Sequence, residues 1–179
     1  MIITISGMPG SGKSTVAGLV AKKLGIKHYS IGDLMGEIAV EKGISLLELS
    51  RIAEKSREID ELLDKKQSNL GNAQDNFVID SRLGWHFIPG SVKIFLDVDL
   101  DTGAKRVYQT KRKDEAENIS LKKTKENILK RIASEKRRYK RYYQLDYFKR
   151  ANYDYVVDTS HISAGKAAED IITFIKRFK

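Results

Sequence analysis

The first 24 residues constrain the fold more than any other part of the chain. Residues 7–15, with the sequence GMPGSGKST, fill every fixed position of the pattern Gly, four residues, Gly-Lys-Ser/Thr. Residues 1–6 form a short apolar run suited to a buried strand, and residues 15–24 carry apolar side chains at helical spacing. A glycine-rich loop between a strand and a helix is the context in which this pattern binds phosphate. The sequence therefore predicts a phosphate-binding loop (P-loop) near its amino end.

The residue types of this loop suit a polyphosphate. Backbone N–H groups can surround phosphate oxygens only where no Cβ blocks the approach, and three glycines provide such openings. Lys13 is expected to reach the β- and γ-phosphates, and the Ser14 hydroxyl to ligate Mg²⁺. A glycine-rich turn without a ligand is the alternative, but it explains neither the Lys-Ser pair nor the flanking strand and helix. We therefore assign the phosphates of ATP to residues Gly7, Pro9, Gly10, Ser11, Gly12, Lys13, Ser14 and Thr15.

The bulk composition limits the remaining chemistry. A length of 179 residues indicates one domain, large enough to bury a core. The absence of cysteine excludes disulfides and thiolate zinc sites, and His28, His86 and His161 are too scattered to suggest a metal cluster. Mg²⁺ that arrives with a nucleotide is the expected metal. The chain has no apolar run long enough to cross a bilayer and no secretory signal pattern, so we expect a cytoplasmic protein.

Five short segments, most of them apolar, predict the strands of a sheet. They cover residues 1–6, 26–30, 77–80, 91–97 and 155–158. Helical patterns alternate with them, which is typical of a parallel α/β sheet covered on both faces. Between the second and third strands, apolar residues recur at helical spacing without a strand pattern, and this predicts a helical insertion over about residues 34–70. The predicted fold is a three-layer P-loop NTPase fold with a five-stranded parallel sheet.

Positive charge is concentrated in one part of the chain. The net charge is +9, and residues 111–150 hold fifteen Lys/Arg against six Asp/Glu, so the other residues balance overall. Such a segment can hold nucleic acid or surround the phosphates of small substrates. Within it, a helix predicted from Ser120 to about Tyr143 places Arg131, Glu135 and Arg138 on one stripe. This stripe can bind a phosphate and a base edge, or Glu135 can simply pair with a neighbouring arginine at the surface.

Charged residues follow the ends of the predicted strands. Asp80 and Asp97 each end a strand, and either can organise the metal; we favour Asp80 because Arg82 follows it. Loops at the carboxyl ends of parallel strands line the ligand crevice, so Arg82 is expected beside the transferring phosphate, with Gly84 permitting close approach of the backbone. A surface charge is the alternative for Arg82. Asp33, which follows the second strand, can be no more than the charge at a helix start.

We compare three classes of protein that contain such a loop. A regulatory GTPase is disfavoured because residues 80–84 do not fit Asp-x-x-Gly and no Asn-Lys-x-Asp occurs. A nucleic-acid-binding ATPase would explain the basic segment, but little chain remains for a nucleic-acid module once the sheet is built. A small phosphotransferase uses every feature: the nucleotide loop, an insertion that holds an acceptor, an acid for Mg²⁺ and an arginine-rich lid.

The sequence resembles the nucleoside monophosphate kinases, and among them the short archaeal-type cytidylate kinases. The resemblance spans essentially the whole chain and rests on the phosphate loop and on residues 30–33 (Ser-Ile-Gly-Asp), 80–82 (Asp-Ser-Arg), 131–139 and 158–160 (Asp-Thr-Ser). The loop is specific only for the superfamily, whereas the combination and spacing of the later motifs indicate the cytidylate branch. The resemblance implies transfer of the ATP γ-phosphate to CMP or dCMP, with a monophosphate-binding insertion and an arginine lid over about residues 111–131.

The resemblance also implies roles for single residues. Arg82 lies in a segment similar to the family's Asp-Gly-Arg and would bind the acceptor phosphate, while Arg131 resembles the lid arginine that bridges phosphates; with Lys13 they form the catalytic set. Arg112 is a further lid arginine. Glu135 and Arg138 fall where the family places an acid and an arginine near the cytosine. The substrate-binding set implied in this way is Ser30, Asp33, Arg82, Gly84, Glu135 and Arg138, and the metal set is Ser14 and Asp80.

Some positions depart from the family pattern. Ser81 replaces a glycine, Glu135 is one methylene longer than the bacterial aspartate, and Lys13-Ser14 replaces the Thr-Thr often seen in archaeal members. The reaction type is therefore predicted more firmly than the base. Adenylate kinase is the second hypothesis, although its Asp-Gly-Phe-Pro-Arg segment is absent, and shikimate kinase would need a Gly-Gly-Gly turn that does not occur. The expected partners are ATP and a nucleoside monophosphate, without nucleic acid or membrane, and the expected state is a monomer.

Overall fold

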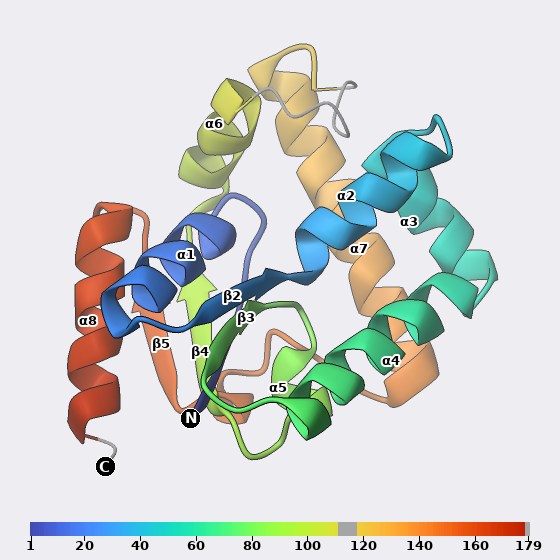
Figure 1. Cartoon of the computed structure of the whole chain (residues 1–179). Coiled ribbons are helices and arrows are strands. Elements are labelled where there is room, and N and C mark those ends of the chain that lie inside the picture. The colour runs from blue at the N-terminus through green and yellow to red at the C-terminus, as the bar shows by residue number, and fades with distance from the viewer. Residues whose placement is uncertain (111–117, 178–179) are drawn as a thin grey trace.

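A five-stranded parallel sheet forms the centre of the molecule (Figure 1). The computed structural model describes residues 1–110 and 118–177. The sheet has the order β2-β3-β1-β4-β5, and every neighbouring pair is parallel. Its strands are β1 (Ile2–Gly7), β2 (Lys27–Ser30), β3 (Phe77–Asp80), β4 (Val92–Asp97) and β5 (Tyr155–Asp158). The register places Asp80 beside both Ile5 and Ser30, so the carboxyl ends of β1, β2 and β3 meet at one edge.

Helices cover both faces of the sheet. α1 (Lys13–Leu24) and α8 (Ala164–Arg177) pack against one face, in a core that contains Val78, Ile94 and Leu96. The alternate strand residues face the other side: Phe95 packs in an aromatic core with the short helix α5 (Gly84–Phe87) and the end of α7 (Leu121–Tyr143). This alternation is what a sheet buried on both faces requires.

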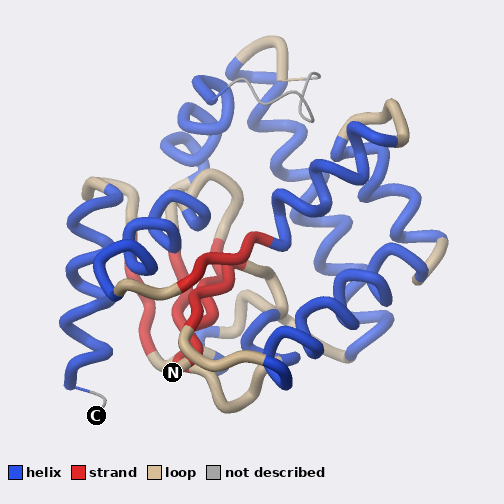
Figure 2. Tube along the Cα trace, in the orientation of Figure 1, coloured by secondary structure: helices blue, strands red, loops and turns tan. Residues whose placement is uncertain are grey.

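The insertion between β2 and β3 consists of three helices. They are α2 (Ile31–Glu41), α3 (Leu46–Lys55) and α4 (Glu58–Ala73), and they share a core with Phe77 and Ile79 of β3. Ser45 and Glu48 form the capping box that starts α3, each side chain accepting the other's backbone N–H. Figure 2 shows these helices on the side of the strands opposite α1 and α8.

α6 (Leu100–Thr110) and α7 complete the wall above the carboxyl end of the sheet. α7 runs beside both α6 and α3, so it spans the distance from the P-loop side of the molecule to the insertion. A short 3₁₀ turn (Arg150–Asn152) leads from α7 into β5. Within the described residues, no helix is both long and apolar enough to cross a bilayer.

The predicted five-stranded parallel α/β fold is confirmed, and the differences concern helix ends and the short helix α5, which was not predicted. α2 begins at Ile31 rather than near residue 34, because the Ser30 hydroxyl accepts the N–H of Asp33 and caps the helix directly after β2. α4 continues to Ala73, through the predicted loop start at Gly71, which packs closely on Ile88. The insertion helices thus cover residues 31–73 instead of about 34–70. The first residues of the predicted lid, 111–117 with Arg112, lie outside the described residues, and residues 121–131 belong to α7.

Candidate active site

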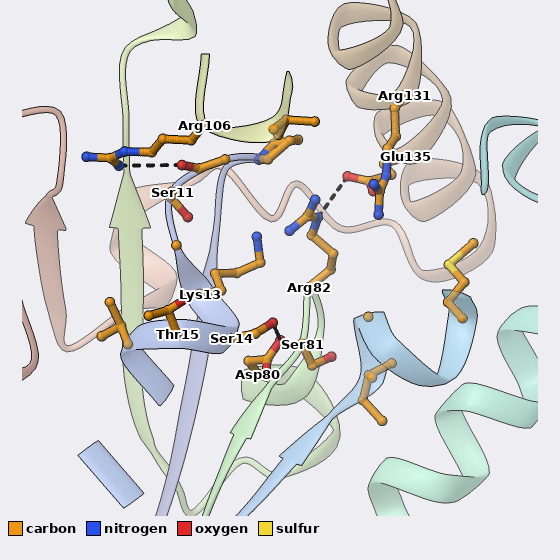
Figure 3. Close-up of a pocket in the computed structure, with 18 of the residues that line it drawn as sticks. Ser11, Lys13, Ser14, Thr15, Asp80, Ser81, Arg82, Arg106, Arg131 and Glu135 are labelled. Atoms are coloured by element: carbon orange, nitrogen blue, oxygen red, sulfur yellow. Dashed lines mark hydrogen bonds and ion pairs between the residues drawn. The ribbon is translucent and has the colours of Figure 1, made fainter. Parts of the chain in front are cut away.

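A cavity of about 680 Å³ opens at the carboxyl end of the sheet. It is lined by the P-loop (residues 9–16), by the end of β3 (residues 80–83), by the insertion, by α6 and α7, and by residues 159–164. Figure 3 shows the P-loop on one side of this space and Arg82, Arg131 and Glu135 on another. The position is the one at which ligands bind in open parallel sheets.

Backbone packing fixes the shape of the P-loop. Gly10 has φ +77°, and a Cβ there would lie 2.3 Å from the carbonyl oxygen of Gly103 in α6. A Cβ on Gly7 would lie 2.2 Å from the Leu96 carbonyl oxygen of β4. These two glycines are therefore needed for close contact with neighbouring backbone. Gly12 caps the amino end of α1, and no side chain among the described residues caps that end, so its first N–H groups are available to an anion.

Lys13 is half-buried and lines the cavity. Its Nζ donates to the carbonyl oxygens of Gly7 (3.2 Å) and Met8 (2.9 Å). Burial, and then the nearby Arg82 guanidinium, lower the pKa of Lys13 well below its usual value. A bound polyphosphate would reverse this effect, because its negative charge favours the ammonium form. The side chain is thus held at the loop by weak acceptors that a phosphate can replace.

Asp80 lies within hydrogen-bond distance of three side chains from two other elements. Its Oδ1 accepts from the Ser14 hydroxyl (3.1 Å) and the Ser30 hydroxyl (3.2 Å), and its Oδ2 lies 2.8 Å from Nε2 of His28. A hydroxyl and a carboxylate are the hard oxygen ligands that Mg²⁺ prefers. Among the described residues no three His, Cys, Asp or Glu side chains form a metal cluster, so a magnesium ion here would depend on nucleotide phosphates and water as well.

Asp97, the other predicted metal candidate, has different partners. Its Oδ2 pairs with Arg150, and its Oδ1 accepts the N–H of Val98. Asp97 is not among the residues that line the cavity, whereas Asp80 is. The geometry therefore favours Asp80 for the metal.

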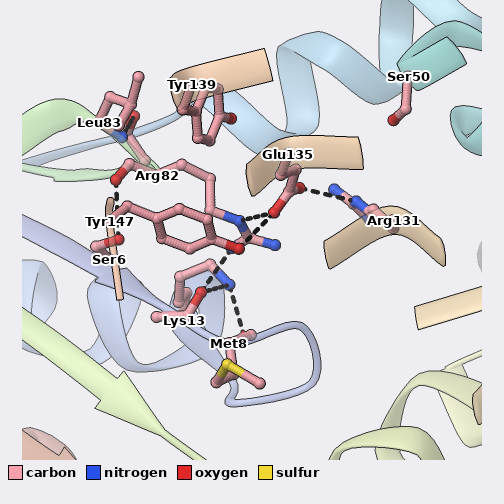
Figure 4. A network of polar contacts seen from close by, with 12 residues as sticks. Ser6, Met8, Lys13, Ser50, Arg82, Leu83, Arg131, Glu135, Tyr139 and Tyr147 are labelled. Atoms are coloured by element: carbon pink, nitrogen blue, oxygen red, sulfur yellow. Dashed lines mark hydrogen bonds and ion pairs between the residues drawn. The ribbon is translucent and has the colours of Figure 1, made fainter. Parts of the chain in front are cut away.

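Two arginines from distant parts of the chain share one buried carboxylate. Glu135 Oε2 accepts from Arg82 Nε (2.9 Å), and Glu135 Oε1 accepts from Arg131 Nε (3.2 Å). Arg82 Nη1 also donates to the Gly7 carbonyl oxygen (2.8 Å), the same atom that accepts from Lys13. Burial alone would raise the pKa of Glu135, but the two guanidinium groups hold it well below its usual range. Two cations and one anion thus leave a positive site that faces the P-loop (Figure 4).

The insertion supplies the wall beyond these arginines. Asp60 of α4 lines the cavity and is only 4% exposed. Its Oδ2 lies 3.1 Å from Arg138 Nε as an ion pair, but no described residue donates a well-aligned hydrogen bond to this oxygen. Burial raises the pKa of Asp60 to about 6, although Arg138 acts in the opposite direction. Gln67 lies nearby and accepts from the Ser81 hydroxyl.

Arg106 of α6 is a cavity residue that sequence reasoning missed. Its Nη2 donates to the Thr159 carbonyl oxygen (2.7 Å), and its Nη1 donates to Thr159 Oγ1 (3.2 Å) and the Gly10 carbonyl oxygen (3.4 Å). It therefore joins α6, the P-loop and the segment after β5. Its sequence surroundings offered no signal, because Lys105 and Arg106 are adjacent basic residues in a predicted helix that no motif marks.

The structure brings most of the predicted site residues together. Pro9 to Thr15, Asp80, Arg82, Arg131 and Glu135 line the cavity. Five other predicted site residues do not line the cavity. Gly7 and Ser30 make the hydrogen bonds described above, and Asp33 is exposed on the first turn of α2. Gly84 packs against Thr4 of β1, and Arg138 lies behind Asp60.

This fold and site define a P-loop kinase: a phosphate cradle and a facing pair of arginines share one cavity that is large enough for more than a polyphosphate. The sequence identifies the branch. Residues 2–161 match the model of the cytidylate kinase-like family, and the chain belongs to that family.

Named relatives agree with this family, and solved structures agree with the fold. The chain is 40% identical to the cytidylate kinase of Natronomonas pharaonis over 91% of its length and 83% of the relative's. It is 34% identical to the cytidylate kinase of Methanobrevibacter smithii over 98% and 99% of the two lengths. A shikimate kinase from Bacteroides thetaiotaomicron, 13% identical, superposes with a TM-score of 0.68 over 98% of each chain. An uncharacterized protein from Eubacterium ventriosum, 23% identical, gives 0.72 over 98% of each chain. The last two similarities concern the fold alone.

Proposed function

We propose that the protein transfers the γ-phosphate of ATP to CMP or dCMP and releases ADP and CDP or dCDP. The observation that carries this proposal is the Arg82–Glu135–Arg131 cluster, in which two half-buried arginines share a buried carboxylate and face the P-loop across one cavity. Two guanidinium groups that share one carboxylate retain a net positive charge suited to a second phosphate. The relatives are cytidylate kinases, and this similarity supplies the base.

The two ends of the cavity suit the two nucleotides. The P-loop and the segment around Arg106 and Thr159 would hold ATP, because the P-loop amides and the amino end of α1 lie there. The insertion, with Arg82 and Arg131 between it and the P-loop, would hold the monophosphate. Arg112 remains a candidate for a further contact with the phosphates of ATP.

The chemistry needs positioning and charge neutralisation rather than a covalent intermediate. An oxygen of the acceptor phosphate would attack the γ-phosphorus in line, while Lys13, Arg82 and Arg131 neutralise the charge of the transferred group. Ser14 and Asp80 would hold Mg²⁺. When bound, this ion neutralises charge on the β- and γ-phosphates. Every group named here belongs to one chain, so we propose that a monomer suffices, and that it works in the cytoplasm, where its nucleotide substrates are found.

The base would be read by Asp60 rather than by Glu135, because Glu135 is engaged by two arginines. Asp60 Oδ2 pairs with Arg138 but accepts no well-aligned hydrogen bond, so a ligand that donates to this buried carboxylate would stabilise it. The exocyclic amino group of cytosine is such a donor, whereas uracil has a carbonyl oxygen at that position. Arg138 behind Asp60 would hold the carboxylate in place.

The test is direct. Purified protein is given Mg·ATP with CMP, dCMP, UMP or AMP in turn, and ADP formation is followed. We expect ADP formation that depends on the acceptor and is fastest with CMP or dCMP. Preference for AMP would support the adenylate kinase alternative. ATP hydrolysis that is as fast without any acceptor, or salt-sensitive RNA binding without preference among monophosphates, would contradict the proposal.

A further inference from the structure

Tyr147 lies outside the cavity, yet it contacts the centre of the arginine cluster. It is fully buried, at 0% exposure, in the segment that follows α7. Its hydroxyl donates to Glu135 Oε2 at 2.7 Å, and the guanidinium carbon of Arg82 lies 5.7 Å from the centre of its ring. Figure 4 shows the ring beside the Arg82 side chain, with the hydroxyl directed at Glu135. The tyrosine is not a cavity-lining residue, so its contact with the site is indirect.

The aromatic core determines where this hydroxyl lies. The backbone oxygen of Tyr147 accepts from the Tyr153 hydroxyl (2.6 Å), and the ring packs against Phe148 (4.1 Å between centres) and edge-on against Tyr139 (5.5 Å). Burial, and then the adjacent Glu135 charge, raise the pKa of Tyr147 well above its usual value. The phenol therefore stays protonated and acts as a fixed donor.

Glu135 needs such a donor because it is shared. Its Oε2 accepts from both Arg82 Nε and Tyr147, while its Oε1 accepts from Arg131. The carboxylate therefore engages the Nε edge of Arg82, and Arg82 Nη1 is held by Gly7. The remaining Arg82 nitrogen, Nη2, has no hydrogen-bond partner among the described residues. Without the phenol, Glu135 would be held only by the two arginines, so the position of the carboxylate that binds Arg82 Nε would be less well fixed.

We propose that Tyr147 is a positioning residue for phosphoryl transfer, which through Glu135 orients the Arg82 guanidinium toward the acceptor phosphate. This inference rests on the proposed function. Its physical basis is that a catalytic group misplaced by about 1 Å can lose about a hundredfold in rate. Tyr147 itself would contact neither nucleotide.

The test is Tyr147→Phe, which removes the hydroxyl and keeps the ring in the aromatic core. We expect kcat/KM for CMP to fall about ten- to a hundredfold, with KM for ATP changed by less than about twofold, because only the acceptor arginine is disturbed. CMP affinity without ATP gives a second readout through the fluorescence of Trp85, the single tryptophan, whose indole N–H donates to the Arg82 carbonyl oxygen (3.2 Å). The matched control is Tyr29→Phe in β2, which removes a hydroxyl that donates to Gln74 (2.8 Å) at the end of α4, and it should alter neither value.

A double-mutant cycle with Glu135→Gln tests whether Tyr147 acts through Glu135. If it does, adding Tyr147→Phe to Glu135→Gln changes acceptor kinetics much less than Tyr147→Phe does alone. The inference would be overturned if the effects of the two substitutions on acceptor kinetics were fully additive. It would also be overturned if Tyr147→Phe left CMP kinetics unchanged or raised KM for ATP and CMP equally. Should Tyr147→Phe unfold, the cycle is run with Tyr153→Phe, which loosens the Tyr147 backbone, under the same criteria. A wild-type protein that phosphorylates no monophosphate would instead refute the proposed function itself.

Discussion

Arg82 shows how one side chain is placed by several parts of the chain. Its Nε binds Glu135 of α7, its Nη1 binds the Gly7 carbonyl of β1, and its own carbonyl oxygen accepts from Ser6 and Trp85. Burial would lower the pKa of Arg82, but Glu135 outweighs that effect and raises it. The residue is therefore a permanent, fixed cation, which is the property required for stabilising charge that moves between two phosphates.

Arg82→Lys tests whether the site needs the planar guanidinium group, with its several N–H donors, or only a positive charge. Lysine keeps the charge but cannot bind Glu135, Gly7 and a phosphate at fixed angles, so we expect kcat to fall about a hundredfold. The conservative change is preferable to alanine, because removing one member of a buried pair costs about 3–5 kcal/mol of unfolding free energy. Arg137→Lys is the matched control: Arg137 is exposed and pairs with Glu54 at 2.7 Å, so its kcat should equal that of wild type. Equal kcat values for the two variants would contradict the role of Arg82.

Asp60→Asn tests the reading of the base. The amide presents donors where the carboxylate offered acceptors, so we expect kcat/KM for CMP relative to UMP to fall about ten- to a hundredfold. Initial rates with both acceptors measure this ratio. Asp75→Asn is the control, since Asp75 is exposed and is not among the residues that line the cavity. If Asp60→Asn leaves this ratio unchanged, Asp60 does not recognise the base, and the proposed kinase reaction is not affected by that result.

Asp60 also predicts a pH dependence of stability. Burial raises its pKa from 3.8 to about 6, so between these values the folded protein binds more protons than the unfolded chain. The free energy of unfolding should therefore fall as the pH rises from about 4 to 7, by up to about 3 kcal/mol relative to Asp60→Asn. Urea denaturation at both pH values checks this, with the exposed Asp75→Asn as the control. A constant difference between wild type and Asp60→Asn would show that Asp60 is not destabilised by burial.

At the scale of elements, α6 supports the P-loop from behind. Gly10 and Gly103 allow the two backbones to touch, and Arg106, one turn further along α6, donates to the Gly10 carbonyl oxygen. A Cβ on Gly103 would lie 2.9 Å from the Pro9 carbonyl oxygen and 3.2 Å from Val98. The loop conformation is thus set by contact with a helix about ninety residues away in sequence.

Gly103→Ala should therefore disturb ATP binding. The added methyl group pushes against Pro9 of the loop, and overpacking of this kind costs about 1–3 kcal/mol, so we expect KM for ATP to rise about tenfold while KM for CMP changes little. Gly165→Ala is the matched control, because a Cβ there meets only Ser163 Oγ at 3.7 Å and alanine favours the helix by about 0.5–1 kcal/mol. It should raise the melting temperature and leave KM for ATP unchanged. A normal KM for ATP in Gly103→Ala would show that the loop tolerates displacement.

Local sequence patterns predicted the helices and strands more accurately than they predicted the contacts between these elements. The bounds of β3 and β5 follow from short apolar runs, and the start of α7 follows from the cap at Ser120. α5 was missed because four residues are too few to show a helical period. Asp60, Arg106 and Tyr147 were missed as site residues because their roles arise from packing between distant elements. In the sequence, Asp60 is only an acidic residue near the start of a polar helix, and Tyr147 is one aromatic residue among several.

On the scale of the whole molecule, α7 connects the insertion to the rest of the site. Tyr142 donates to the backbone oxygens of Ala53 (3.2 Å) and Glu54 (3.3 Å) in α3, and Tyr143 donates to Asp64 of α4. The same helix carries Arg131 and Glu135. Movement of the insertion on binding a monophosphate would therefore be transmitted to the arginines through α7, so closure around the acceptor and assembly of the phosphate site would occur together.

The single cavity predicts how joined nucleotides bind. The P-loop and the insertion line the same space of about 680 Å³, so a ligand with adenosine and cytidine at the two ends of one phosphate chain can occupy both sites at once. Linking two binding groups makes the second event intramolecular, so we expect this ligand to bind about 10²- to 10⁴-fold more tightly than ATP. Calorimetric competition measures the affinities, and the same phosphate chain with adenosine alone is the control ligand. If the two ligands bind equally, the cytidine end finds no site beside the P-loop, and an acceptor pocket within the insertion is excluded.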